Sequence, residues 1–140
     1  MKKWAGDDLL KYMYFAKFAK NTQSQYEVEF PDFTPVVATY GDNLQEALHM
    51  AHDALEGYLL VAEDSHDAVP APKNAEEISV APHVLLIPIE VDTTLARERE
   101  ENKLVKKTLT IPAYLNTLGK ERGVNFSATL TTALKEKLER

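Results

Sequence analysis

Three polar side chains near the C-terminal end of the chain have the spacing needed to contact DNA. Lys106, Thr108 and Thr110 alternate with Leu109 and Ile111, so a strand here carries the polar residues on one side and the apolar residues on the other. A two-stranded ribbon fits the DNA major groove, where threonine hydroxyls reach base edges and lysines neutralise phosphates. We therefore interpret the polar side of this strand as a DNA-contacting surface.

Two helices are predicted after this strand. Pro112 suits the first turn of a helix over residues 113–122, Gly123 closes that helix, and Ser127 is expected to cap the next. The apolar stripe of the last helix consists of Phe126, Leu130, Ala133, Leu134 and Leu138. Free amides at its start are suited to hold a backbone phosphate. The candidate DNA-binding residues are Lys106, Lys107, Thr108, Thr110, Asn125 and Ser127.

The strand and two helices form a segment too short to fold alone. Residues 105–140 offer little surface to bury, and a lone strand leaves its ladder hydrogen bonds unmade. The simplest solution is a symmetric homodimer in which two copies of the strand pair antiparallel. We therefore expect dimerisation through this segment, and any assembly above the dimer is left open.

Other groups of titratable residues give weaker indications of chemistry. His49 and Asp53 form an i,i+4 pair with metal-ligand spacing, but mixed helix faces present such pairs by chance. The consecutive residues Ser65, His66 and Asp67 cannot converge on one proton path. Turn and cap positions already explain three other carboxylates, Asp32, Asp42 and Glu46. We expect no catalytic residue, no metal and no cofactor.

The first 92 residues have the pattern of a small mixed sheet. Alternating apolar residues predict a strand over residues 26–30, and apolar runs predict strands over 36–40 and 83–92. Residues 11–18 have aromatic side chains on both parities, which favours a strand with both faces partly covered over a helix. Pro88 lies inside that run and removes a ladder donor, which favours an edge strand or a bulge. The fold class expected for the whole chain is α+β.

One long helix is predicted between the third and fourth strands. Asn43 and Glu46 form a capping pair, and apolar residues then repeat at three- and four-residue steps as far as Ala62. Residues 63–77 are polar and carry two prolines, which indicates a loop. Residues 93–104 are expected to be a charged linker that is largely helical.

Net charge differs sharply between the two parts of the chain. Residues 1–92 carry 6 Lys/Arg against 16 Asp/Glu, a net charge of −10, whereas residues 93–140 carry 10 against 6, a net charge of +4. The chain has no cysteine, and Asp7 and Asp8 interrupt the N-terminal region where a signal peptide would need apolar residues. We expect a cytoplasmic protein without a membrane segment.

Two sets of residues resemble known families. Residues 107–112 (Lys-Thr-Leu-Thr-Ile-Pro) and 123–127 (Gly-Val-Asn-Phe-Ser) resemble the ribbon-helix-helix DNA-binding family. The preceding part resembles the HicB antitoxin family. That resemblance is carried by an aromatic first strand (residues 11–18), a second strand ending in Phe-Pro-Asp (26–32), the turn Gly41-Asp42 and a helix rich in Glu-Ala-Leu (46–56).

The resemblance implies a fold and a pair of activities. A HicB-like domain over residues 1–92, of a reduced ribonuclease-H-like fold, would bind and mask a HicA-type toxin, a small basic ribonuclease that cleaves mRNA. After the linker at 93–104, a ribbon-helix-helix domain over residues 105–140 would dimerise, bind operator DNA and repress its own operon. The sequence leaves two alternatives: a stand-alone dimeric transcriptional regulator with an acidic ligand- or protein-binding domain, and a metal-dependent nuclease.

Overall fold

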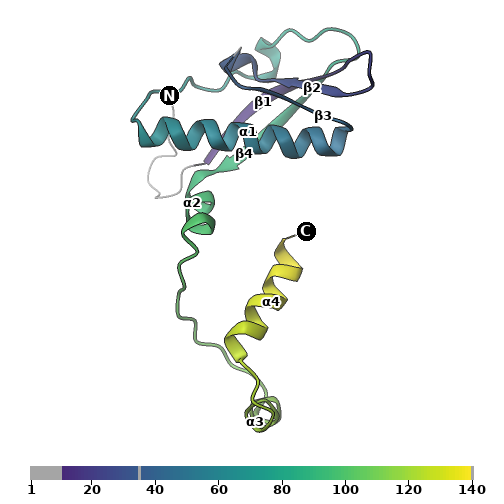
Figure 1. Cartoon of the computed structure of the whole chain (residues 1–140). Helices are drawn as coiled ribbons and strands as arrows, with labels where there is room; N and C mark the ends of the chain where they lie inside the picture. The colour runs from purple at the N-terminus through teal and green to yellow at the C-terminus, as the bar shows by residue number, and fades with distance from the viewer. Residues whose placement is uncertain (1–10, 35, 140) are drawn as a thin grey trace. The chain divides into compact units, whose positions relative to one another are not determined.

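The computed structural model describes residues 11–34 and 36–139, and these form two compact units (Figure 1). The first unit ends at Lys103 and the second begins at Leu104. Asp7 and Asp8, whose charges argue against a signal peptide, lie outside the described residues. In the described ranges, no helix has both the length and the hydropathy needed to cross a membrane.

The first unit contains a four-stranded sheet (Figure 1). Its strands are β1 (Lys11–Lys20), β2 (Tyr26–Glu29), β3 (Ala38–Gly41) and β4 (Leu85–Asp92), in the order β3-β2-β1-β4. Every pair of neighbours is antiparallel. The α+β class is therefore confirmed, but the prediction of a mixed sheet is wrong.

The direction of β4 follows from the long connection that precedes it. Helix α1 (Leu44–Asp64) ends beside the start of β1, where the Tyr12 hydroxyl donates a hydrogen bond to Glu63. Residues 65–84 then lead the chain back to the other end of the sheet, and β4 begins opposite Phe18. A direct helical crossover would make β4 parallel to β3, whereas this return makes it antiparallel to β1.

Pro88 lies in an edge strand, as one of the two sequence interpretations requires. β4 is the last strand of the sheet, and Pro88 is opposite Phe15 of β1. The third strand begins at Ala38, two residues later than predicted. Val36 and Val37 instead donate backbone hydrogen bonds to the carbonyl of Phe33, which closes a turn before the strand.

The core lies between one face of the sheet and α1. From Tyr12 to Phe18 the even-numbered side chains of β1 point to this face and are buried, and the alternate side chains from Met13 to Ala19 are half-buried. α1 covers them with the side chains that its three- and four-residue spacing places on one face: Ala47, Ala51, Leu55, Leu59 and Ala62. The predicted long helix is thus present and ends two residues beyond Ala62.

The start of α1 is fixed by its cap and by a close approach to β3. Asn43 accepts a hydrogen bond from the Glu46 amide at 2.8 Å, while the Glu46 carboxylate accepts one from the Asp42 amide at 2.6 Å. A Cβ atom at Gly41 would lie 2.4 Å from the backbone nitrogen of Ala47. The helix can therefore begin this close to β3 only because residue 41 has no side chain.

The charged segment after β4 belongs to the first unit for most of its length. Residues Thr93–Glu101 form α2, which Asp92 caps by accepting a hydrogen bond from the Leu95 amide at 2.9 Å. Thr93 and Ala96 are buried on this helix, and Asn102 ends it in a left-handed conformation with φ 55°. The segment predicted as a largely helical linker is thus a packed helix over residues 93–101, followed by a turn and residues without regular secondary structure.

The second unit contains two helices, α3 (Ala113–Glu121) and α4 (Phe126–Leu138). Gly123 joins them with φ 67°, a conformation that favours glycine. A Cβ atom at Gly119 would lie 2.5 Å from the Phe126 ring, so the ring packs directly on the backbone of α3. The prediction that Ser127 caps the last helix is wrong. The capping residue is Asn125, whose side chain accepts a hydrogen bond from the Ala128 amide at 3.0 Å.

We expect Gly41→Ala and Gly57→Ala to change stability in opposite directions. The first places a methyl group against the backbone of α1 and should destabilise the first unit by about 1 to 3 kcal/mol. The second adds a helix-favouring residue where no atom lies within 4 Å and should stabilise it by about 1 kcal/mol. Urea unfolding followed by circular dichroism measures both, and equal shifts in one direction would contradict the packing at Gly41.

Candidate functional sites

Glu63 connects three elements of the first unit at the end of α1. Its carboxylate accepts hydrogen bonds from the hydroxyls of Tyr12, at 2.6 Å, and Thr93, at 2.7 Å, and pairs with Arg97 at 3.0 Å. The Arg97 guanidinium also pairs with Asp64 at 3.0 Å. These bonds attach α2 to α1 and to β1.

The surroundings of Glu63 alter the ionisation of its partners. Burial, and next the hydrogen bond to Glu63, raise the pKa of the Tyr12 hydroxyl. The hydrogen bond to Glu63 also raises the pKa of Arg97. No local sequence pattern predicts this cluster, because Glu63 is 51 residues from Tyr12 and 34 residues from Arg97. We assign it a structural role, since it positions the helix that leads to the second unit.

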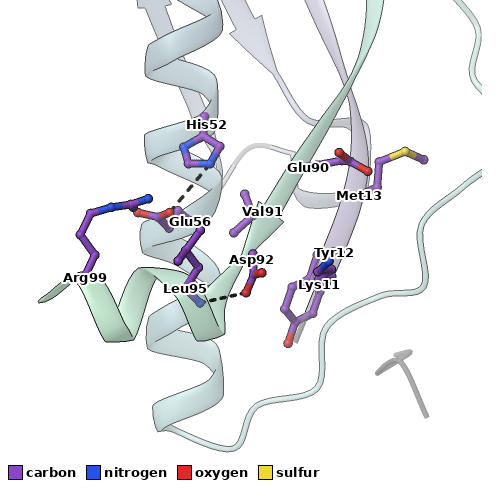
Figure 2. Close-up of a pocket in the computed structure, with 10 residues that line it drawn as sticks. All are labelled: Lys11, Tyr12, Met13, His52, Glu56, Glu90, Val91, Asp92, Leu95 and Arg99. Atoms are coloured by element: carbon purple, nitrogen blue, oxygen red, sulfur yellow. Dashed lines mark hydrogen bonds and ion pairs between the residues drawn. The ribbon is translucent and has the colours of Figure 1, made fainter. Parts of the chain in front are cut away.

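A cavity of about 680 Å³ lies near this cluster, between the ends of β1 and β4 and the helices α1 and α2 (Figure 2). His52 faces Glu56 along α1, with 3.8 Å between the His52 Nε2 and a Glu56 carboxylate oxygen. Side chains of both charges line the cavity, namely Lys11, Arg99, Glu56, Glu90 and Asp92. Within the described part of the chain, no three His, Asp or Glu side chains are grouped to hold a metal ion.

Apart from Asp32, the residues considered for metal binding or catalysis have local contacts that account for them. His49 and His52 lie 3.2 Å and 3.5 Å from the Asp53 carboxylate, and all three side chains are exposed to solvent by at least 40%. His66 has φ 57° in the turn that ends α1, where the Ser65 and Asp67 amides donate hydrogen bonds back to the helix. The Asp42 amide and the Glu46 carboxylate are hydrogen-bonded at the start of α1. Asp32 lies in the 3-10 helix Pro31–Phe33, where its Oδ2 is buried without a hydrogen-bond partner among the described residues.

The candidate DNA-binding residues lie on two elements of the second unit. Lys106, Lys107, Thr108 and Thr110 are exposed in the segment before α3, and Asn125 and Ser127 lie at the start of α4. The predicted strand is not formed within a single chain, and residues 103–112 have no secondary structure. The Asn125 side chain is engaged by the Ala128 amide, and this cap aligns the first turn of α4.

Replacing Glu63 by Ala is expected to destabilise the first unit by about 2 to 3 kcal/mol, because Tyr12 and Arg97 lose their shared acceptor. Glu98→Ala removes an exposed carboxylate from α2 and should change stability by less than about 0.5 kcal/mol. Chemical denaturation of both variants measures the difference. Equal stabilities would show that the Glu63 cluster does not hold α2.

The first unit should lose stability in alkali through Tyr14. Burial raises the pKa of Tyr14 to about 12, and its hydroxyl donates a hydrogen bond to the Pro70 carbonyl at 2.5 Å. The folded protein thus keeps a proton that the unfolded chain releases near pH 10, so stability is complete below pH 10 and falls as pH rises toward 12. Tyr14→Phe should remove about 2 kcal/mol of that pH-dependent loss in denaturation curves measured from pH 9 to 12.

Comparison with known proteins identifies the family. The model for "HicB_like antitoxin of bacterial toxin-antitoxin system" matches residues 13–92, more than half of the chain. A chain from a toxin-antitoxin complex of Streptococcus pneumoniae is 29% identical, with a TM-score of 0.56, and the match covers 91% of this chain and 99% of that one. The antitoxin HicB of Burkholderia pseudomallei shares the fold at 20% identity and a TM-score of 0.52, with the same coverage. No match was found among curated proteins. The chain therefore belongs to the HicB-like antitoxins of bacterial toxin-antitoxin systems.

Proposed function

We propose that the first unit binds and neutralises a HicA-type, mRNA-cleaving toxin and that the second unit dimerises and represses the operon by binding operator DNA. The protein would act in the cytoplasm, without metal or cofactor. Family membership and the likeness to a chain of the Streptococcus pneumoniae toxin-antitoxin complex support a toxin partner. The observation that carries the second activity is the exposure of apolar side chains throughout residues 104–139.

The second unit buries almost nothing within one chain. Gly119 is its single buried residue among those described. Between 39% and 75% of the surface is exposed on the apolar side chains that a core would need, namely Leu109, Ile111, Leu115, Leu118, Phe126, Leu134 and Leu138. Exposed apolar side chains of this kind are stabilised when a partner with an apolar surface buries them, and a second copy of the segment provides such a surface.

Dimerisation of this kind supports the DNA-binding proposal. Two copies of residues 106–111, paired antiparallel, place Leu109 and Ile111 on one side against the helices. The opposite side then presents Lys106, Thr108 and Thr110 from both copies as a ribbon for the major groove. Lys107 is available to a phosphate, and the aligned amides at the start of α4, near Asn125 and Ser127, can hold another.

The DNA-binding proposal predicts a large effect of one triple variant. Changing Lys106, Thr108 and Thr110 together to Ala should weaken binding to the DNA upstream of the gene by at least about tenfold, because base and phosphate contacts are lost. Lys106→Ala alone should lower the salt slope by about one. A matched control changes Thr131, Thr132 and Lys135, which are exposed on α4.

Gel-shift titration and analytical ultracentrifugation provide the readouts. Unchanged DNA binding by the triple variant would overturn the assignment of the ribbon, and a stable monomer of the wild-type chain at micromolar concentration would overturn the dimer. Loss of binding in the control alone would place the DNA contact on α4. Failure of the wild-type protein to protect mRNA from the co-encoded toxin would overturn the neutralising activity.

A further inference from the structure

One side of α1 carries an apolar line beside the buried face of the helix, where Ala54 is half-buried against the core and Met50, Gly57 and Val61 are exposed. Met50, Ala54, Gly57 and Val61 follow one another at steps of four, three and four residues, so they share one strip of the helix surface. Met50 is 37% exposed and Val61 is 63% exposed. We name these four residues the outer stripe of α1.

Gly57 lies within the outer stripe and has no side chain, so the helix surface is flat at this position. It lies within a 21-residue helix, where glycine is the least favourable residue other than proline. A Cβ atom at this position would have no neighbour within 4 Å, and Gly57 is not among the residues with positive φ. Neither packing nor backbone conformation within the chain therefore requires glycine here, whereas close approach by another molecule would.

Acidic side chains form a second line beside the outer stripe. Glu46, Asp53 and Asp64 are spaced by seven and eleven residues, which places them along one flank of the stripe. α1 as a whole has five Asp or Glu residues and no Lys or Arg. Asp64 pairs with Arg97 of α2, but Asp53 has only histidines 49 and 52 as its ion-pair partners in the described residues. The helix therefore presents an apolar centre with an anionic flank.

The other open surfaces of the first unit are less suited to a cationic partner. The free edge of β4 is interrupted by Pro88, which cannot donate to an added strand. The cavity at the ends of β1 and β4 includes Lys11 and Arg99 in its lining, so its charge is mixed. A hollow of about 750 Å³ beside β2 and β3 likewise contains Lys17 with Glu27 and Glu29.

From this comparison we propose that the outer stripe of α1 is the surface on which the toxin docks, through an apolar patch bordered by cationic side chains. The inference rests on the proposed function, because it takes the toxin as the partner. The flat centre at Gly57 allows the two backbones to approach, and the anionic flank orients the cationic border. This surface uses no residue of the proposed DNA-binding ribbon.

Two sets of variants test the docking surface with matched changes. Met50→Lys with Val61→Lys adds two cations to the outer stripe, at positions 37% and 63% exposed. The control, Val36→Lys with Val80→Lys, adds the same charge outside α1 at positions 69% and 37% exposed. Binding of the co-encoded toxin to each full-length variant is measured by isothermal titration calorimetry.

The stripe variant should bind the toxin at least about 30-fold more weakly than the wild type, whereas the control should stay within about threefold. Gly57→Lys should weaken binding similarly while raising the melting temperature, since lysine favours a helix more than glycine does. A gain in stability with a loss of binding separates docking from a folding defect.

The outcomes distinguish this inference from the proposed function. If the wild-type chain does not bind the toxin, the proposed function itself fails. Should the wild type bind while the stripe variants bind equally well, or the control alone lose binding, toxin docking on α1 is overturned. A change in the mass of the assembly on Gly57→Lys, measured without toxin, would assign the stripe to a second copy of this chain and would equally overturn the proposal.

Discussion

The packing of α1 against the even-numbered side chains of β1 is the interaction on which the first unit depends. Tyr12, Tyr14, Ala16 and Phe18 are each at most 4% exposed, and they lie beneath a helix whose small residues, such as Ala47 and Ala51, let it approach closely. The approach is so close that Gly41 meets the backbone of α1. Because α1 ends beside the start of β1, residues 65–84 must return the chain to the other end of the sheet before β4 begins.

The Glu63 cluster extends that packing to the end of the first unit. Once α1 has crossed the sheet, Glu63 lies beside Tyr12, and β4 must return from the opposite end before Thr93 and Arg97 can reach the same carboxylate. Thirty or more residues separate Glu63 from each partner, so the cluster depends on contacts between parts of the chain that are far apart in sequence. It fixes α2 to the rest of the unit, and the extended part of the linker is thereby confined to a short stretch after Asn102.

The two units differ in how their apolar side chains are removed from water. The first encloses its apolar side chains within one chain and leaves an acidic surface, including the anionic flank of α1. The second is basic and leaves its apolar side chains exposed, so its stability depends on association. A net charge of −6 for the whole chain describes neither unit, because it is the sum of −10 and +4.

Periodicity in the sequence was sufficient to predict the elements of the first unit. Aromatic residues on both parities predicted β1, and alternation predicted β2. The capping pair and the three- and four-residue repeat predicted α1, and Pro88 indicated an edge strand or a bulge. The sequence also predicted α3 and α4, although it placed the last cap on Ser127 rather than Asn125. These features depend on residues that are near one another in the chain, which is why local patterns reveal them.

Only the tertiary structure decided how distant residues meet. It made the sheet wholly antiparallel, because residues 65–84 return the chain before β4, and it joined α2 to the first unit through Glu63. It also showed that a Cβ atom at Gly57 would have no neighbour within 4 Å, which made an apolar repeat a candidate docking surface. The physical reason is that side-chain periodicity specifies which face of an element is apolar, whereas the chain path between elements specifies what that face will contact.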